Sequence, residues 1–331
     1  MRLRAPSWLV AMGLLGATDW GFGWYAQRHF LPAHKLEAAL SAGSGCVGLA
    51  GDSRMAAAAT AVADRLGAGR GAPKLCVVDL SLGGVGLAGE AVFVRTYLER
   101  EGRPDLLILG TVPESIVRNA PVDPSDWIGS EALTLLWSRA GDAKLHFGGR
   151  PRNIGELDSR IRYELYRRSS LATFRSSLWR YGQRLQDQLV GGSPGEENRF
   201  GGVEDMRALG DRFRGDAEAA LRDHRPGTPW SYSPWLDEMM VELAKHGVGL
   251  IFAELPMPSN YRAVRESPAG RSLRSQLRDD LESRGGWFVD VSAPPGFTDR
   301  LFEDGIHLGP EGARLVSETL SIAVAERDRR P

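Results

Sequence analysis

Short apolar runs alternate with stretches of helical periodicity over most of the chain. Five apolar runs predict buried strands, at 46–50, 74–82, 105–112, 249–255 and 287–291. Five amphipathic or alanine-rich stretches predict helices, at 55–66, 88–100, 235–246, 271–284 and 310–325. Strands that are apolar throughout are typical of a parallel sheet with helices on both faces. The pattern therefore predicts an α/β fold with a flavodoxin-like, five-stranded sheet, whose functional crevice lies at the carboxyl ends of the strands.

A helical insertion is predicted at about 113–232, where the alternation stops. Apolar residues recur at three-to-four spacing through 154–189, which indicates helices. Nine arginines and four acids lie within 150–187. We expect a helical cap with a solvated basic face. The alternative is a surface that touches anionic lipid or an acidic polymer.

The N-terminus, residues 1–34, is predicted to be a signal anchor and linker. A basic start precedes an apolar run at 8–17, and aromatic residues follow it. Residues 5–26 are just long enough to cross a bilayer, although Asp19 interrupts them. No small-x-small cleavage site stands out, so we expect an uncleaved, single-pass anchor in the cell membrane. The remainder, 35–331, would then lie in the periplasm or outside the cell. The alternative is a buried N-terminal helix of a cytoplasmic protein.

Composition excludes several classes of protein. The chain of 331 residues has 41 Lys and Arg against 42 Asp and Glu, and this balance argues against nucleic acid as a partner. Two cysteines, Cys46 and Cys76, cannot form a disulfide framework or a four-thiolate zinc site. Both lie in apolar runs, so we expect buried thiols, with one disulfide as the alternative. The histidines show no paired metal spacing, and no metal site is predicted.

Candidate chemistry lies near both ends of the predicted sheet region. Ser53 follows the first strand and precedes a helix, where backbone N–H groups can stabilise an oxyanion. A serine hydroxyl needs a base to become a nucleophile. Asp304 stands three residues before His307, and an acid so placed can orient an imidazole that acts as that base. Asp299 and Glu303 are alternative orienting acids. No G-x-S-x-G elbow is present.

These residues carry a family resemblance. Gly51-Asp52-Ser53 and Asp304-x-x-His307 resemble the first and last sequence blocks of the SGNH (GDSL-type) hydrolase superfamily. The resemblance covers roughly 45–112 and 235–325. It implies that Ser53 is the nucleophile, His307 the general base and Asp304 the residue that orients it. It also implies an oxyanion hole formed by the N–H groups of Ser53 and Gly84, with Gly83 as the alternative to Gly84.

The third block departs from the family pattern. Val112 stands where the family has an asparagine that donates to the oxyanion. Loss of one such donor costs about a hundredfold in rate or more. Either Thr111 substitutes as a donor, or the chemistry is slow or specialised. Arg54 replaces the leucine of the GDSL signature. We expect Arg54 and Thr111 to contact substrate, Arg54 through an anionic group; the alternative for Arg54 is an ion pair with an acid on its helix.

The predicted anchor and the irregular third block are similar to the envelope branch of the superfamily, which includes alginate-acetylation and D-alanylation factors. This resemblance implies an extracytoplasmic serine esterase or O-acyltransferase that acts on acyl esters, such as acetyl groups of a surface polysaccharide. Its implied partners are an acylated carbohydrate and a membrane-bound acyltransferase, and it needs no cofactor or metal. The alternative function is a catalytically silent accessory subunit of such an acyltransferase.

Overall fold

The computed structural model of the chain describes residues 17–18, 31–42, 44–67, 76–82, 86–100, 103–117, 161, 203–222, 224, 227–303 and 306–327. The chain divides into two compact units, Met1–Lys35 with Trp127–Gly195, and Leu36–Asp126 with Glu196–Pro331. Nearly all described residues belong to the second unit, which we call the sheet unit. Most of the predicted anchor and linker, and most of the predicted insertion, lie outside the described residues. Within the described part of the chain, no helix is both long and apolar enough to span a bilayer.

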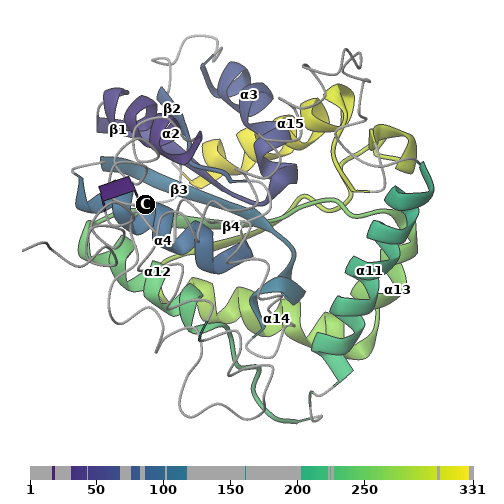
Figure 1. The fold of residues 1–331 in the computed structure, drawn as a ribbon. Coiled ribbons are helices and arrows are strands. Elements are labelled where there is room, and N and C mark those ends of the chain that lie inside the picture. Colours follow the sequence, from purple (N-terminus) through teal and green to yellow (C-terminus); the bar gives the residue numbers. More distant parts are fainter. Residues whose placement is uncertain are drawn as a thin grey trace, which may run out of the picture. The chain divides into compact units, whose positions relative to one another are not determined.

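The sheet unit is built on five parallel strands, which confirms the predicted fold class. The strands are β1 (Ser44–Gly51), β2 (Cys76–Asp79), β3 (Arg103–Thr111), β4 (Gly249–Glu254) and β5 (Trp287–Asp290). Their order is β2-β1-β3-β4-β5, and every neighbouring pair is parallel. This is the flavodoxin-like order, in which the chain reverses its direction across the sheet after β2 (Figure 1).

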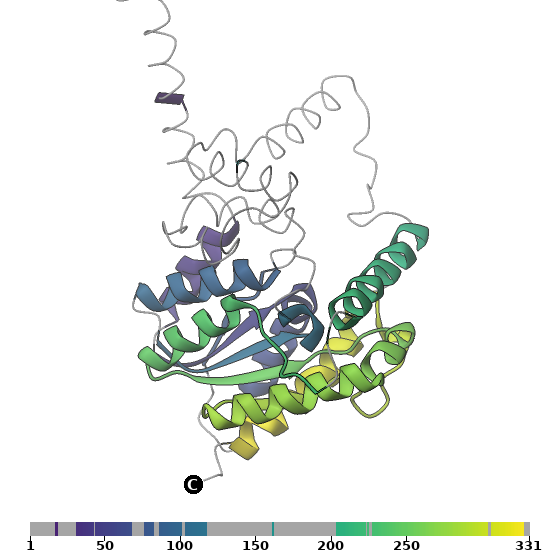
Figure 2. The ribbon, with the colours of Figure 1, turned by 90° about the horizontal axis from the view of Figure 1, so that it is seen from below.

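Helices cover the sheet and bury its apolar strands. Helices α3 (Ser53–Gly67) and α15 (Pro310–Arg327) pack against each other on one face. Their apolar side chains form one core cluster with those of β1, β3 and β4. Helices α4 (Gly86–Glu99) and α12 (Pro234–Lys245) pack against each other and against β1 and β4 (Figure 2), and α14 (Pro268–Ser283) packs on β5. A short α2 (Leu31–Ser41) precedes β1.

The predicted insertion has adjoining ends. The chain leaves the sheet through a 3₁₀ turn, η1 (Pro113–Ile116), and Val117 then pairs with Tyr232 in an antiparallel bridge. The backbone N–H of Ser233 donates to Ile116 O at 2.7 Å. Between these points the structure describes one long helix, α11 (Val203–Arg222), which packs on η1, η2 (Ser259–Tyr261) and α13 (Arg262–Arg265).

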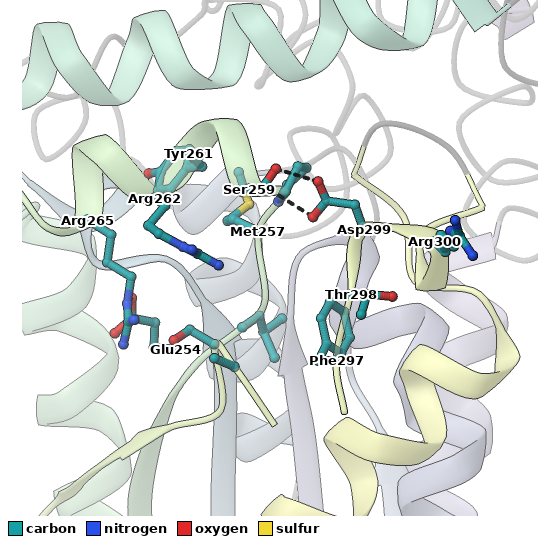
Figure 3. Close-up of a pocket in the computed structure, with 14 residues that line it drawn as sticks. Glu254, Met257, Ser259, Tyr261, Arg262, Arg265, Phe297, Thr298, Asp299 and Arg300 are labelled. Carbon is teal, nitrogen blue, oxygen red and sulfur yellow. Dashed lines mark hydrogen bonds and ion pairs between the residues drawn. The ribbon is translucent and has the colours of Figure 1, made fainter. Parts of the chain in front are cut away.

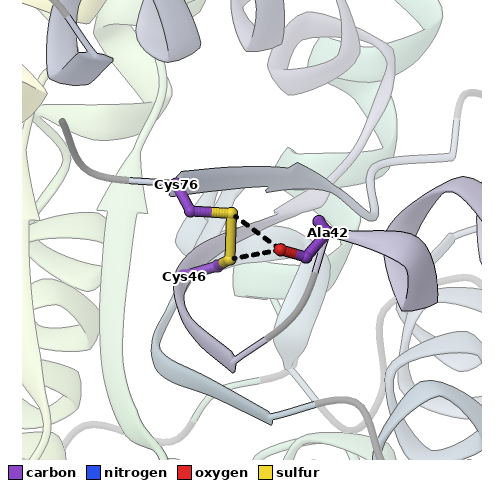
Figure 4. The surroundings of a disulfide bond; sticks show 3 residues. All are labelled: Ala42, Cys46 and Cys76. Carbon is purple, nitrogen blue, oxygen red and sulfur yellow. Dashed lines mark hydrogen bonds between the residues drawn. A yellow bond between two sulfur atoms is a disulfide. The ribbon is translucent and has the colours of Figure 1, made fainter.

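The two cysteines form a disulfide, so the expectation of buried thiols is wrong and the alternative holds. Cys46 and Cys76 are direct neighbours in the register of β1 and β2, with a Cα–Cα distance of 4.4 Å. The carbonyl oxygen of Ala42 lies 3.8 Å from Cys46 Sγ and 3.6 Å from Cys76 Sγ (Figure 4). The strand register, which the apolar pattern did not predict, is what brings the two sulfurs together.

Strand β2 ends earlier than its apolar run. The run predicts a strand to residue 82, whereas the regular strand ends at Asp79, although the N–H groups of Leu80 and Leu82 still donate to Leu49 O and Gly51 O of β1 at 2.7 Å and 3.2 Å. The carboxylate of Asp79 accepts a hydrogen bond from the backbone N–H of Ser81 at 3.0 Å. A side chain that bonds the backbone two residues ahead favours a turn over a strand. Leu80 and Leu82 are nevertheless buried, which accounts for their apolar character.

Candidate active site

The turn that carries Ser53 is held by two glycines in adjacent strands. Gly51 has φ +139°, and a Cβ built there would lie 2.1 Å from the carbonyl oxygen of Gly110. The backbone N–H of Asp52 donates to that same oxygen at 3.3 Å. Only glycine allows β1 and β3 to approach so closely at this point. Ser53 therefore lies at the first position of α3, at the carboxyl edge of the sheet.

A buried carboxylate of α4, Glu90, forms hydrogen bonds to the backbone of this turn. Glu90 Oε2 accepts from the N–H of Gly51 at 3.2 Å, and Glu90 Oε1 accepts from the N–H of Leu82 at 2.8 Å. Because the N–H of Leu82 also donates to Gly51 O at 3.2 Å, Glu90 satisfies the N–H of Gly51 and links the carboxyl end of β1 to the segment after β2. Glu90 is not among the functional residues predicted from the sequence. The signal was a single acid inside an apolar helical stretch, since such an acid is buried only when it is paired.

Arg54 is engaged within the protein. It is 5% exposed, and its Nε donates to Asp52 Oδ1 at 3.0 Å while a terminal nitrogen forms an ion pair with Asp52 Oδ2. The guanidinium also donates to Pro256 O at 3.3 Å and touches Met257 Sδ. Burial, the largest single effect, lowers the pKa of Arg54, but the charge and hydrogen bond of Asp52, together with Tyr261 and Glu114, outweigh burial and raise the pKa overall. Arg54 therefore forms an ion pair, as its alternative role expected, but the partner is Asp52, which precedes α3, and not an acid on the helix.

Thr111 is likewise occupied by protein groups. Its hydroxyl donates to Asp52 Oδ2 at 3.1 Å and lies 3.0 Å from Ser115 Oγ, which itself donates to Val112 O at 2.7 Å. Thr111 has a single hydroxyl hydrogen, and both of its neighbours compete for it. In this arrangement Thr111 holds Asp52 in place and has no second hydrogen to offer an oxyanion.

His307 lies on a short loop directly before α15. Phe302 and Leu308 pair in an antiparallel bridge across the loop, and the N–H of Glu303 donates to His307 O at 2.9 Å. Asp304 lies outside the described residues, as do Gly83 and Gly84. Asp299, one alternative orienting acid, instead accepts from the N–H of Ser259 at 3.0 Å and from its hydroxyl at 2.5 Å.

The elements bearing Ser53 and His307 meet at one edge of the sheet. Both α3 and α15 begin at the carboxyl ends of the strands and pack side by side (Figure 1). Met55, two residues after Ser53, and Leu308, which follows His307, belong to the same core cluster. Among the described residues, no hydrogen bond joins Ser53 to His307. Catalytic hydrogen bonds are often long before substrate binds, so the shared edge is the informative observation.

A buried network of charges extends along the same edge toward β5. Arg274 of α14 donates to Glu114 Oε1 at 2.8 Å and to Glu254 Oε1 at 2.7 Å. Arg265 donates to Glu254 Oε1 at 3.0 Å, and the hydroxyl of Tyr261 donates to Glu114 Oε2 at 3.0 Å. Both carboxylates are almost fully buried. None of the residues in this network is among the site residues predicted from the sequence.

The network shifts the pKa values of its members. Burial raises the pKa of Glu254, and the attraction of Arg274 only partly offsets this effect. Burial and the neighbouring carboxylate of Glu114 raise the pKa of Tyr261 well above its usual value. Tyr261 is therefore a neutral hydrogen-bond donor. The Oε2 atom of Glu254 is buried and has no hydrogen-bond partner in the described part of the chain.

A pocket of about 440 Å³ opens beside this network, at the carboxyl ends of β4 and β5. One wall is the segment after β4, with Met257, Ser259 and Arg262, and the other is the segment after β5, with Phe297 and Asp299 (Figure 3). The pocket adjoins the Ser53 turn, because Arg54 contacts Pro256 and Met257 of the first wall. This is the edge where open α/β sheets bind their ligands.

Comparison with known proteins gives no family assignment. No protein-family model matches the chain, and no curated protein matches it in sequence.

Proposed function

We propose that the chain is an SGNH-type serine hydrolase or O-acyltransferase that acts on acyl esters outside the cytoplasm. The proposed ester is an acetyl group on a surface carbohydrate, and the proposed N-terminal anchor holds the enzyme at the membrane. The observation that carries the proposal is the packing of α3 on α15, which puts the turn with Ser53 and the loop with His307 at one edge.

The proposed reaction has two half-reactions. Ser53 Oγ attacks the ester carbonyl carbon while its proton passes to His307, which Asp304 orients. The oxyanion accepts hydrogen bonds from the N–H groups of Ser53 and Gly84. Collapse expels the alcohol, which takes the proton from His307, and leaves an acyl-enzyme. Water or an acceptor hydroxyl then attacks the acyl group and regenerates Ser53. We assign Arg54 and Thr111 a supporting part, since both hold Asp52 beside the nucleophile.

A second candidate function is a silent accessory subunit of a membrane-bound acyltransferase. Two observations favour it. Val112 is buried where an oxyanion donor is expected, and the hydroxyl of Thr111 is already shared between Asp52 and Ser115. A protein of this kind would keep the fold but would not catalyse acyl transfer or ester hydrolysis.

A serine-directed fluorophosphonate probe separates the two candidates. The enzyme proposal expects the full-length chain to be labelled on Ser53, located by mass spectrometry of the modified peptide. It also expects hydrolysis of a fluorogenic acetyl ester to fall at least a thousandfold in Ser53→Ala and in His307→Ala. Product analysis with a sugar acceptor then distinguishes transfer from hydrolysis.

Ser283→Ala is the matched control, because Ser283 is an exposed serine at the far end of α14. It should keep both labelling and ester hydrolysis. Absence of labelling in a folded wild-type chain, or equal hydrolysis by wild type and Ser53→Ala, would reject the enzyme and leave the accessory subunit.

A further inference from the structure

Among the described residues, Arg262 is the cation whose side chain is directed into the pocket after β4 and β5. In Figure 3 the side chain of Arg262 extends from α13 into the space between the two walls. This side chain is 70% exposed, and its only ion pair in the described chain, with Glu266, is at 4.0 Å. A guanidinium so weakly engaged keeps its donors available for a planar anion such as a carboxylate or a phosphate.

The other charges around the pocket are already compensated or directed elsewhere. Arg265 lies between Glu254 and Asp290 and forms ion pairs with both. Arg300 points away from the pocket in Figure 3. Asp299 uses both carboxylate oxygens to bind Ser259 across the pocket. An anion would therefore lie against the wall that bears Arg262, away from Asp299.

The rest of the lining suits a small hydroxylated ring. Phe297 and Met257 offer apolar surface, and Phe297 is fixed by edge-on packing against Phe302, with 5.4 Å between the ring centroids. Thr298 adds a hydroxyl group, and the hydroxyl of Ser292, which donates to Asp290 Oδ1 at 2.6 Å, adds an acceptor oxygen. The volume of about 440 Å³ lies within the range of small-molecule sites, which are mainly apolar with a few placed polar groups.

From this arrangement we infer that the pocket binds an anionic ligand of monosaccharide size, a sugar bearing a carboxylate or a phosphate, with its charged group on Arg262. The pocket and the Ser53 turn are linked through Met257, which lines the pocket and contacts Arg54. As a subsite for the ester substrate, this assignment rests on the proposed function. As a binding site, it stands on the pocket alone.

Binding is measured on the full-length Ser53→Ala chain, so that no turnover interferes. The probes are methyl glucuronide, glucose 6-phosphate and neutral methyl glucoside, followed by titration calorimetry or ligand-observed NMR. At least one charged sugar should bind about tenfold more tightly than methyl glucoside. Which of the two binds better identifies a carboxylate or a phosphate as the natural group.

Arg262→Ala should weaken the charged sugar about tenfold and leave the neutral sugar unchanged. Arg300→Ala is the matched control, because it removes an arginine from the same pocket rim that points away, and it should change binding less than twofold. Equal binding of charged and neutral sugars, no binding of either, or equal effects of the two substitutions would overturn the inference. Charged-sugar binding without serine labelling in wild type would reject the enzyme and keep the pocket.

Discussion

The two ends of the sheet are held together by different means. At the amino end, the Cys46–Cys76 disulfide joins β1 to β2 covalently. At the carboxyl end, buried ion pairs join Asp52 to Arg54 and link Arg274 to two glutamates. Buried ion pairs contribute little net stability, because desolvation of the charges offsets their attraction. If stability were the only requirement, apolar side chains could replace these buried ion pairs at the carboxyl end.

The carboxyl end itself holds two unlike ion clusters. Asp52 keeps 28% of its side chain exposed, whereas Glu114 and Glu254 keep only 1% and 2%. The first cluster lies beside the candidate nucleophile, and the second lies under the pocket wall. This difference in hydration predicts how much folding stability is lost when one ion-pair partner is removed from each cluster.

Arg274→Met should have the largest effect. It leaves Glu114 and Glu254 buried without the cation between them, and we expect a loss of about 3–5 kcal/mol in the free energy of unfolding. Urea denaturation measures it. Arg271→Met is the control on the same helix, since Arg271 is exposed, and should change stability by about 0.5 kcal/mol or less. A comparable loss in both variants would mean that the network does not hold this edge.

Removal of the disulfide should come next. Cys46→Ala combined with Cys76→Ala opens a loop of sequence separation 30. The chain-entropy estimate for such a loop is about 3.5 kcal/mol. Denaturation of wild type in the presence of a reductant should give the same value as the double variant in its absence. If reduction leaves the unfolding midpoint unchanged, the covalent link does not stabilise the amino end.

Arg54→Met should cost less than Arg274→Met. The carboxylate left behind, Asp52, still reaches water, so we expect a loss of about 1–3 kcal/mol. Because Asp52 adjoins Ser53, labelling by the serine probe should also slow. Arg54→Lys keeps the positive charge, so it should retain part of the stability and part of the labelling rate that Arg54→Met loses. A loss as large as that of Arg274→Met would contradict the role given to hydration.

Glu254→Gln should have the smallest effect and should depend on pH. The raised pKa of Glu254 means that the folded state binds its proton more tightly than the unfolded state. Wild-type stability therefore falls as pH rises from the ordinary glutamate pKa through the raised one. The glutamine variant lacks this contribution, so its stability relative to wild type should increase over that window. Parallel pH profiles of the two chains would show that Glu254 ionises as in the unfolded state.

The fold was predictable because burial and local sequence agree. Apolar runs such as 249–255 can be satisfied only between two layers of helices, and β4 with its neighbours lies there. Ser53 and His307 could be placed at one edge for the same reason, since both follow from the alternation of strands and helices.

The side-chain partners could not be predicted in the same way. Glu114 and Arg274 are separated by 160 residues, and nothing local in the sequence marks either as the partner of the other. The Cys46–Cys76 pairing depends on a strand register that apolar periodicity does not determine. The pocket also depends on two loops whose approach is set by the fold.

Ser53 lies inside the covalent ring that the two cysteines close. A protease cut between residues 47 and 75 would divide the backbone without releasing a fragment, because the sulfur link would keep both pieces attached. A gel run without reductant would still show one band of full mass. A single cut outside this ring would instead separate the chain into two fragments under the same conditions. The disulfide thus keeps the segment that bears the candidate nucleophile attached after one cleavage.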